Sequence, residues 1–208
     1  MERTSIIKIS MSQKKEKYQR LYQKLNEYQS LGLDAINALE KILEIKTIEK
    51  KEYLTELYEE KRKIGFVLEG IIRVYHLTSD GLEFNKNFFI KDELFMTTLS
   101  NTKDTSVFIQ SVKECTVIIF DYDEYIKLSH THQVLEQTLN KIFLRYLDKK
   151  QEREIDLLAL DAKSRYIKFI KNNPYLSEKL EQFHVASYLG VTPTQLSRIK
   201  KVVKNQHL

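Results

Sequence analysis

The chain has 208 residues, 42% of them hydrophobic and 30% charged, with only 5 glycines, 2 prolines and 1 cysteine. This composition is typical of a globular chain long enough for two small domains, and it excludes a disordered chain and a disulfide framework. No apolar run approaches the roughly 18–20 residues of a membrane helix. The N-terminal sequence MERTSIIKIS lacks the apolar stretch of a secretory signal, so we expect a cytoplasmic protein.

The first predicted elements are two amphipathic helices. Residues 12–29 place one stripe at helical spacing, made of Tyr18, Leu21, Tyr22, Leu25 and Tyr28. A break around Gly32 follows, and a second helix then carries the stripe Ile36, Leu39, Ile42 and Leu43. Both stripes are typical of packing faces, and we assign residues 1–30 to an N-terminal helical extension.

Between residues 48 and 120 the helical period gives way to short strand-like runs. β-Branched and aromatic residues fill Gly65–Leu77, Asp80-Gly81 suits a hairpin turn, and Thr105–Asp121 holds two further strands. Several short strands without a long helix between them predict an antiparallel β-sandwich or barrel. We assign residues 31–130 to this β-domain and expect Cys115, inside one of its strands, to be a buried thiol.

A long helix is predicted for residues 131–158. Its second half, DKKQEREID, is strongly charged and favours a linker that leaves the core. An apolar seam in this helix either packs on the chain's own β-domain or pairs with a second copy as a dimer seam. The seam residues are Leu135, Leu139, Ile142, Phe143 and Tyr146.

The segment Leu180–Asn205 predicts two short helices joined by a tight turn. Ala186 leaves room for a crossing helix, and Gly190 accepts the positive φ that ends the first helix. Thr192 is a good N-cap, and Pro193 suits the first position of the second helix. This is the layout of a helix-turn-helix whose second helix enters a DNA major groove. A plain helical hairpin with a solvated polar face is the alternative.

Positive charge is concentrated in the same region. Residues 161–208 carry nine Lys/Arg against three Asp/Glu, a net charge of +6, whereas the whole chain is +5 and residues 1–160 sum to −1. A localised basic field attracts phosphate and speeds the encounter with nucleic acid. A basic surface kept for solubility is the alternative. We assign residues 159–208 to a DNA-binding domain and expect double-stranded DNA as its partner.

The order of helices, β-domain, long helix and helix-turn-helix resembles the Crp/Fnr family of bacterial transcription regulators. The resemblance runs from Leu31 to Lys204 and is strongest in Phe66–Gly81, the long helix and Ala186–Lys201. It implies an α+β fold with a jelly-roll-like β-roll similar to a cyclic-nucleotide-binding domain, a dimerisation helix and a winged-helix-like domain. It also implies a homodimer that binds a two-fold-symmetric operator.

The resemblance assigns DNA contacts to particular residues. Arg198 matches the arginine that contacts a guanine late in the recognition helix, a contact that contributes about 1–3 kcal/mol of base discrimination. Pro193 cannot hydrogen-bond a base edge, so base contacts fall on nearby polar residues, while the lysines meet phosphates. The chain ends soon after this helix, so we expect a wing to be short or missing. The predicted DNA-binding residues are Thr192, Thr194, Gln195, Ser197, Arg198, Lys200, Lys201 and Lys204.

The effector region departs from the cyclic-nucleotide binders, which carry a Gly-Glu pair and an Arg-Ser or Arg-Thr pair. No arginine occurs from Asn85 to Leu128, and neighbouring carboxylates would repel a cyclic phosphate. We therefore expect no cofactor and an unknown effector other than classical cAMP. One cysteine cannot hold an Fnr-type iron–sulfur cluster, whereas His76 stays a candidate haem ligand. The candidate pocket residues are Lys91, Asp92, Glu93, Thr105 and Ser106.

These features predict a homodimeric transcription regulator that is not an enzyme. The sequence has no GxSxG, P-loop, HExxH or CxxC motif. Its histidines form no metal-ligand pattern except His130/His132, where a helix start favours exposure. RNA polymerase is a candidate further partner, and we expect no membrane partner. The alternative function is a ligand-binding signalling module whose C-terminal helices contact a protein partner.

Overall fold

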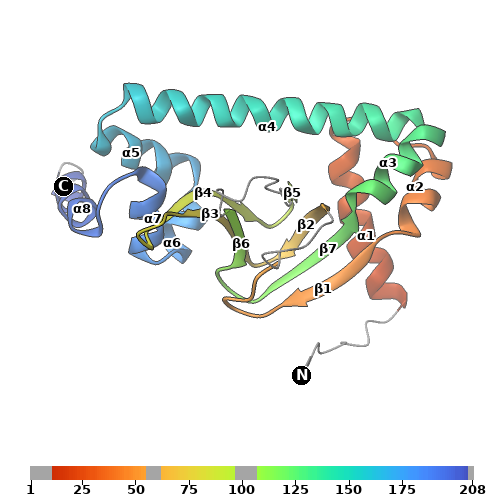
Figure 1. Cartoon of the computed structure of the whole chain (residues 1–208), viewed down its shortest axis with the longest axis horizontal. Coiled ribbons are helices and arrows are strands. Elements are labelled where there is room, and N and C mark those ends of the chain that lie inside the picture. The colour runs from red at the N-terminus through yellow and green to blue at the C-terminus, as the bar shows by residue number, and fades with distance from the viewer. Residues whose placement is uncertain (1–10, 55–61, 97–106, 206–208) are drawn as a thin grey trace. The chain divides into compact units, whose positions relative to one another are not determined.

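The computed structural model describes residues 11–54, 62–96 and 107–205 (Figure 1). Its contacts divide the chain into an N-terminal unit, Met1–Val74 with Phe88–Phe143, and a C-terminal unit, Tyr75–Asn87 with Leu144–Leu208. This division differs from the predicted boundaries. The first helix shares the core of the β-domain, the long helix contributes to both units, and the segment Tyr75–Asn87 belongs with the C-terminal helices.

The strands form two sheets. The first has the order β1-β7-β2-β5 with antiparallel neighbours, and the second has the order β4-β3-β6. Strands β3 and β4 continue from the N-terminal unit into the C-terminal unit. The β-roll expected from the sequence is thereby confirmed. The strands are β1 (Glu44–Ile48), β2 (Lys63–Glu69), β3 (Ile71–Leu77), β4 (Glu83–Ile90), β5 (Leu94–Met96), β6 (Val107–Ser111) and β7 (Cys115–Asp121).

Strand β2 is buried on both faces, which explains its continuous apolar sequence. Ile64, Phe66 and Leu68 belong to the core that the first sheet shares with helices. Val67, which points to the opposite face, packs with Ile72 of the second sheet. Successive side chains of a strand point to opposite faces, so the positions from Ile64 to Leu68, between two layers, are all buried.

Aromatic side chains fill the space between the two sheets. The rings of Phe89 and Phe95 lie 5.8 Å apart, and both are buried. Phe95 also lies directly over Gly65, where an added Cβ would meet the ring at 2.1 Å. Cys115 is buried in the same cluster, as expected, and burial raises the pKa of its thiol to about 11.

Three helices, α1 (Met11–Asn26), α2 (Leu33–Glu40) and α3 (Tyr122–Thr131), pack on the other face of the first sheet (Figure 1). Tyr18, Leu21 and Leu25 of α1 are buried, as the predicted stripe requires, whereas Tyr28 lies in the turn after the helix ends at Asn26 and is partly exposed. The Tyr18 hydroxyl donates to the Leu43 carbonyl at 2.8 Å. Helix α1 is therefore part of the core of the N-terminal unit.

The C-terminal unit consists of helices and the end of the β3–β4 hairpin. Helix α4 (Gln133–Ala159) enters it at Leu144, and α5 (Ala162–Asn172), α6 (Pro174–Lys179), α7 (Gln182–Leu189) and α8 (Pro193–Asn205) follow. Asp161 caps α5 because its carboxylate accepts the Ser164 N–H at 2.7 Å. Among the described residues, no helix combines the length and apolarity needed to cross a membrane.

Candidate nucleic-acid interface

The turn between α7 and α8 has the geometry that the sequence predicts. Gly190 adopts φ 67° and ψ 37°, a left-handed conformation that strains residues with a Cβ. The Gly190 N–H donates to the Ser187 carbonyl at 3.3 Å, and the Val191 N–H donates to the Ala186 carbonyl at 3.1 Å. These bonds satisfy the last carbonyls of α7. Ala186 is fully buried, as expected where a second helix crosses.

A reciprocal pair of hydrogen bonds fixes the start of α8. The Gln195 N–H donates to the Thr192 hydroxyl at 3.2 Å, and the Thr192 N–H donates to the Gln195 side-chain oxygen at 2.9 Å. This is a capping box, which satisfies two backbone donors that the helix itself leaves unpaired. Thr192 is therefore confirmed as the N-cap, and Pro193 occupies the first helical position.

Helix α8 presents a cationic face to solvent. Thr194, Arg198 and Lys201 follow one another at i, i+4 and i+7 and share one stripe, with Lys200 and Lys204 beside it. All five residues are exposed. Helix α8 contains no Asp or Glu, and within the described ranges no hydrogen bond or ion pair engages its four cationic side chains. The positive charge of this face is thus uncompensated locally.

Two of the predicted DNA-binding residues are placed differently from the rest. The side-chain oxygen of Gln195 is engaged in the capping box, and Ser197 is only partly exposed. Thr194 and Arg198 are therefore exposed polar side chains of α8 that the capping box does not engage. The pattern Thr-x-x-Gln before an apolar helix is a capping-box signature, so the sequence already held the signal for Gln195.

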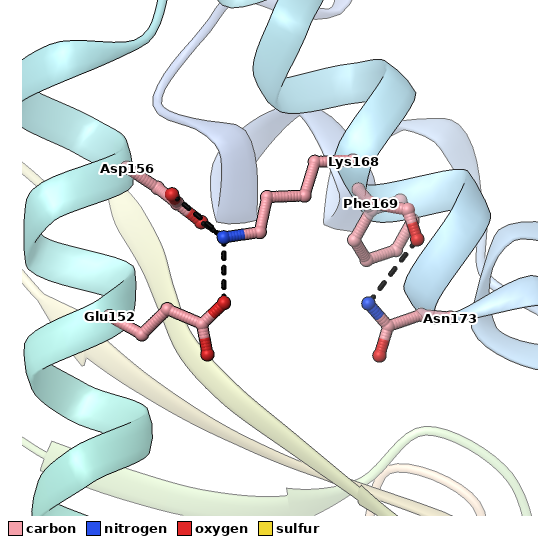
Figure 2. Close-up of polar contacts among 5 residues, drawn as sticks. All are labelled: Glu152, Asp156, Lys168, Phe169 and Asn173. Carbon is pink, nitrogen blue, oxygen red and sulfur yellow. Dashed lines mark hydrogen bonds and ion pairs between the residues drawn. The ribbon is translucent and has the colours of Figure 1, made fainter.

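A lysine joins the long helix α4 to α5. Figure 2 shows Lys168 of α5 between two carboxylates of α4, Glu152 at 2.7 Å and Asp156 at 2.7 Å. The hydrogen bonds from Asp156 and Glu152 raise the pKa of Lys168. One turn along α5, the Asn173 side-chain amide donates to the Phe169 carbonyl at 3.2 Å and closes the end of the helix (Figure 2).

An arginine of α5 connects the end of α4 to the turn between α7 and α8. Arg165 donates to the Leu160 carbonyl after α4 at 2.6 Å and to the Leu189 carbonyl at the end of α7 at 3.1 Å. Cations are favoured near the carbonyl ends of helices. No local pattern in the sequence points to Arg165 or Lys168, because their partners lie up to 24 residues away in the chain.

The candidate effector residues have structural partners in the N-terminal unit. The Asp92 carboxylate accepts a hydrogen bond from Arg20 Nε of α1 at 3.1 Å, and the Glu93 carboxylate accepts the Ile90 N–H at 3.0 Å. Lys91 is exposed in the same turn. Asp92 and Glu93 thus hold the β4–β5 turn, while Thr105 and Ser106 lie outside the described residues.

No protein-family model matches the chain, and no curated protein matches it by sequence. Solved structures do match. FixK2 from Bradyrhizobium japonicum aligns with a TM-score of 0.68 and 17% identity over 80% of this chain and 86% of its own. A regulator of the Crp/Fnr family from Eubacterium rectale aligns with a TM-score of 0.65 and 12% identity over 85% of both chains.

A third match is CLP from Xanthomonas campestris, described as a c-di-GMP responsive global regulator. It aligns with a TM-score of 0.62 and 15% identity over 85% of this chain and 94% of its own. The chain has the Crp/Fnr fold. The order of elements predicted from the sequence is therefore confirmed over most of the chain.

Four of the five residues of the predicted dimer seam on α4 contact the core of the chain's own N-terminal unit. Leu135 and Leu139 are buried in the core of their own unit, and Ile142 and Phe143 pack against that core. Only Tyr146 of the predicted set is exposed, and the Lys150 ammonium lies 5.3 Å from its ring. These four residues are used inside the chain because α4 begins as part of the β-domain's helical layer.

A different stripe of α4 is exposed. Leu144 is 62% exposed, Leu147 58%, Ile155 53% and Leu158 82%. With Gln151 they recur at spacings of three and four residues, the period of a coiled-coil seam. Large apolar side chains left together in solvent at this period favour a helix partner.

Proposed function

We propose that the chain is a DNA-binding transcription regulator that acts through α8. The observation that carries this proposal is the uncompensated cationic face of α8, held on a helix-turn-helix within a Crp/Fnr fold. A cationic face of this kind releases counterions from DNA on binding. An α-helix such as α8, the second helix of the helix-turn-helix, fits the width of the major groove. Arg198 supplies base discrimination, and Lys200, Lys201 and Lys204 contact phosphates.

We propose further that the regulator is a homodimer paired through the exposed α4 stripe, Leu144, Leu147, Gln151, Ile155 and Leu158. Parallel pairing relates two copies of α8 by one two-fold axis. This symmetry suits half-sites about one DNA turn, roughly 34 Å, apart. Gln151 lies in the middle of the stripe, where a polar residue favours one register of the two helices.

The effector, where one exists, is not a classical cyclic nucleotide. The carboxylates of Asp92 and Glu93 already have partners in the β4–β5 turn, and the space between the sheets holds apolar side chains of the chain itself. We therefore expect the protein to bind DNA without an added ligand.

Selection of binding sites from a random duplex library, with full-length protein at two salt concentrations, tests the function. We expect an enriched two-fold-symmetric site whose affinity falls with salt. Arg198→Ala should weaken binding to this site about 5- to 150-fold, the equivalent of one bidentate base contact. Lys201→Ala should lower the salt dependence by about one counterion without changing the selected sequence.

The matched control is Lys127→Ala, which removes an exposed lysine from α3 in the other unit. It should leave affinity and salt dependence unchanged. Absence of salt-dependent binding to any duplex would contradict the proposal and favour a helix-turn-helix that contacts a protein.

Sedimentation at micromolar concentration tests the dimer. Leu147→Asp should convert a wild-type dimer to a monomer, because it places a charge in the apolar seam. Leu33→Asp, at a leucine of α2 that is 71% exposed, is the control and should stay dimeric. A wild-type monomer would refute the proposed seam without affecting the assignment of α8.

A further inference from the structure

The side chain of Gln195 has only one of its two polar atoms in use. Its oxygen accepts the Thr192 N–H at 2.9 Å and closes the capping box at the start of α8. Its side-chain nitrogen has no hydrogen-bond partner among the described residues, and the residue is exposed. Gln195 thus presents to solvent a donor that the fold itself does not employ.

The orientation of this side-chain amide follows from the chemistry of its partner. A backbone N–H can only donate, so the atom that faces Thr192 has to be the oxygen. An amide turned over would place its NH2 group against another donor and leave both without an acceptor. The oxygen is therefore held on the backbone, and the nitrogen is the atom left for a ligand.

The capping box also fixes the side chain before any ligand binds. A free glutamine loses rotamer freedom when it contacts a partner, which weakens the contact. Gln195 has already lost this freedom on folding, because its oxygen is bonded to the Thr192 N–H. Its donor is therefore pre-organised for binding.

Gln195 lies at the third position of α8, which begins at Pro193. In a helix-turn-helix, the N-terminal residues of the second helix contact base edges in the major groove. A free glutamine pairs there with adenine, because its nitrogen donates to N7 while its oxygen accepts from the N6 amino group. With the oxygen engaged by the backbone, Gln195 lacks the second half of that pair.

The neighbouring side chains of α8 are poor in acceptors as well. Helix α8 contains no Asp or Glu, and Arg198 carries only donors. In the segment Pro193–Arg198, the remaining side-chain acceptors are the hydroxyls of Thr194 and Ser197. Guanine presents two acceptors in the major groove, N7 and O6, whereas cytosine presents a donor. This part of α8 therefore suits guanine best.

We propose that Gln195 is a specificity residue that acts only as a donor and selects guanine over adenine and cytosine at one base pair of the DNA site. The inference deepens the proposed function and rests on it. The base preference is opposite to that of an unconstrained glutamine, so the two can be told apart by experiment.

Hydrogen exchange of the full-length protein tests whether the oxygen is held. Gln195→Leu, which has no acceptor, should speed exchange of the Thr192 amide about fivefold or more. Gln195→Glu should keep this exchange slow, because a carboxylate at the same position also accepts in a capping box. Equal exchange rates in the wild type and Gln195→Leu would overturn the proposal.

Site selection with the same proteins tests the base preference. The base pair that Gln195 contacts is the one that loses its preference in Gln195→Leu and keeps it in Arg198→Ala. We expect guanine there in the wild type, with about two- to tenfold weaker binding of the adenine duplex, the range of one net hydrogen bond. Gln195→Glu should move the preference to cytosine, because a carboxylate accepts from the N4 amino group.

The matched control is Gln137→Glu, which makes the same change at an exposed glutamine of α4 in the N-terminal unit. It should select the wild-type sequence. Adenine at the wild-type position, an unchanged preference in Gln195→Glu, or no base pair that depends on Gln195 would overturn the proposal and leave the assignment of α8 to DNA binding intact. Absence of binding of any duplex by the wild type would overturn the proposed function and this inference together.

Discussion

In the N-terminal unit, β2 is buried on both faces and aromatic rings fill the space between the sheets. In the C-terminal unit, the helices are joined to one another and to the hairpin by side chains that bond to backbone carbonyls, such as Arg153 and Arg165. Apolar burial is strong and tolerates little change, whereas single polar contacts are weak and can be exchanged. The difference suits a rigid N-terminal unit and a C-terminal unit whose polar contacts can be exchanged.

The largest expected effect is the loss of core packing by α1. Leu21→Ala should lower the free energy of unfolding by about 2–5 kcal/mol, because it opens a cavity beside β2. Urea denaturation measures this, with Leu33→Ala at an exposed site of α2 as the control. A loss no larger than that of Leu33→Ala would show that α1 adds nothing to the stability of the roll.

Overfilling the roll should have the next largest effect. Gly65→Ala would place a Cβ at 2.1 Å from the Phe95 ring, and overpacking of this kind costs about 1–3 kcal/mol. Gly32→Ala is the control, since nothing lies within 4 Å of its added Cβ. Thermal unfolding should separate the two variants. Equal melting temperatures would mean that the interior adapts and is not rigid.

A smaller effect is expected at the start of α8. Thr192→Ala removes the capping hydroxyl and should cost about 1 kcal/mol of stability. The Thr192 N–H, which donates to the Gln195 side-chain oxygen, is kept in this variant, so the sequence enriched in a site selection should not change. Thr131→Ala, which loses only a bond to the Leu128 carbonyl at the end of α3, should change neither quantity.

The smallest effect is expected at the ion pairs between α4 and α5. Lys168→Met should lower stability slightly at neutral pH and low salt, because exposed pairs are weak and screened. The raised pKa of Lys168 means that its contribution is complete below the ordinary lysine pKa and is lost as pH rises through the raised value. The difference from wild type should therefore vanish at high pH.

Lys171→Met, at an exposed lysine of the same helix, is the control for this variant. Its stability should not differ from wild type at any pH. A difference between Lys168→Met and wild type that persists at high pH would point to packing by the lysine's carbon chain in place of its charge.

The sequence by itself determined the features that depend on local spacing. The tyrosine–leucine stripe of α1, the β-roll, the left-handed turn at Gly190 and the N-cap Thr192 are all where their patterns predict them. Each depends on residues within a few positions of one another, so periodicity and turn chemistry suffice. The resemblance to the Crp/Fnr fold follows from the order of these elements.

The tertiary structure decided which partner each side chain meets. It placed Leu135 and Leu139 inside their own core, so the exposed stripe of α4 is a different one, and it engaged Asp92 with Arg20 of α1. It also brought Ser187 to Glu83, a residue more than 100 positions away. Contacts at such separation depend on how whole elements pack, and a single sequence carries no local pattern that specifies them.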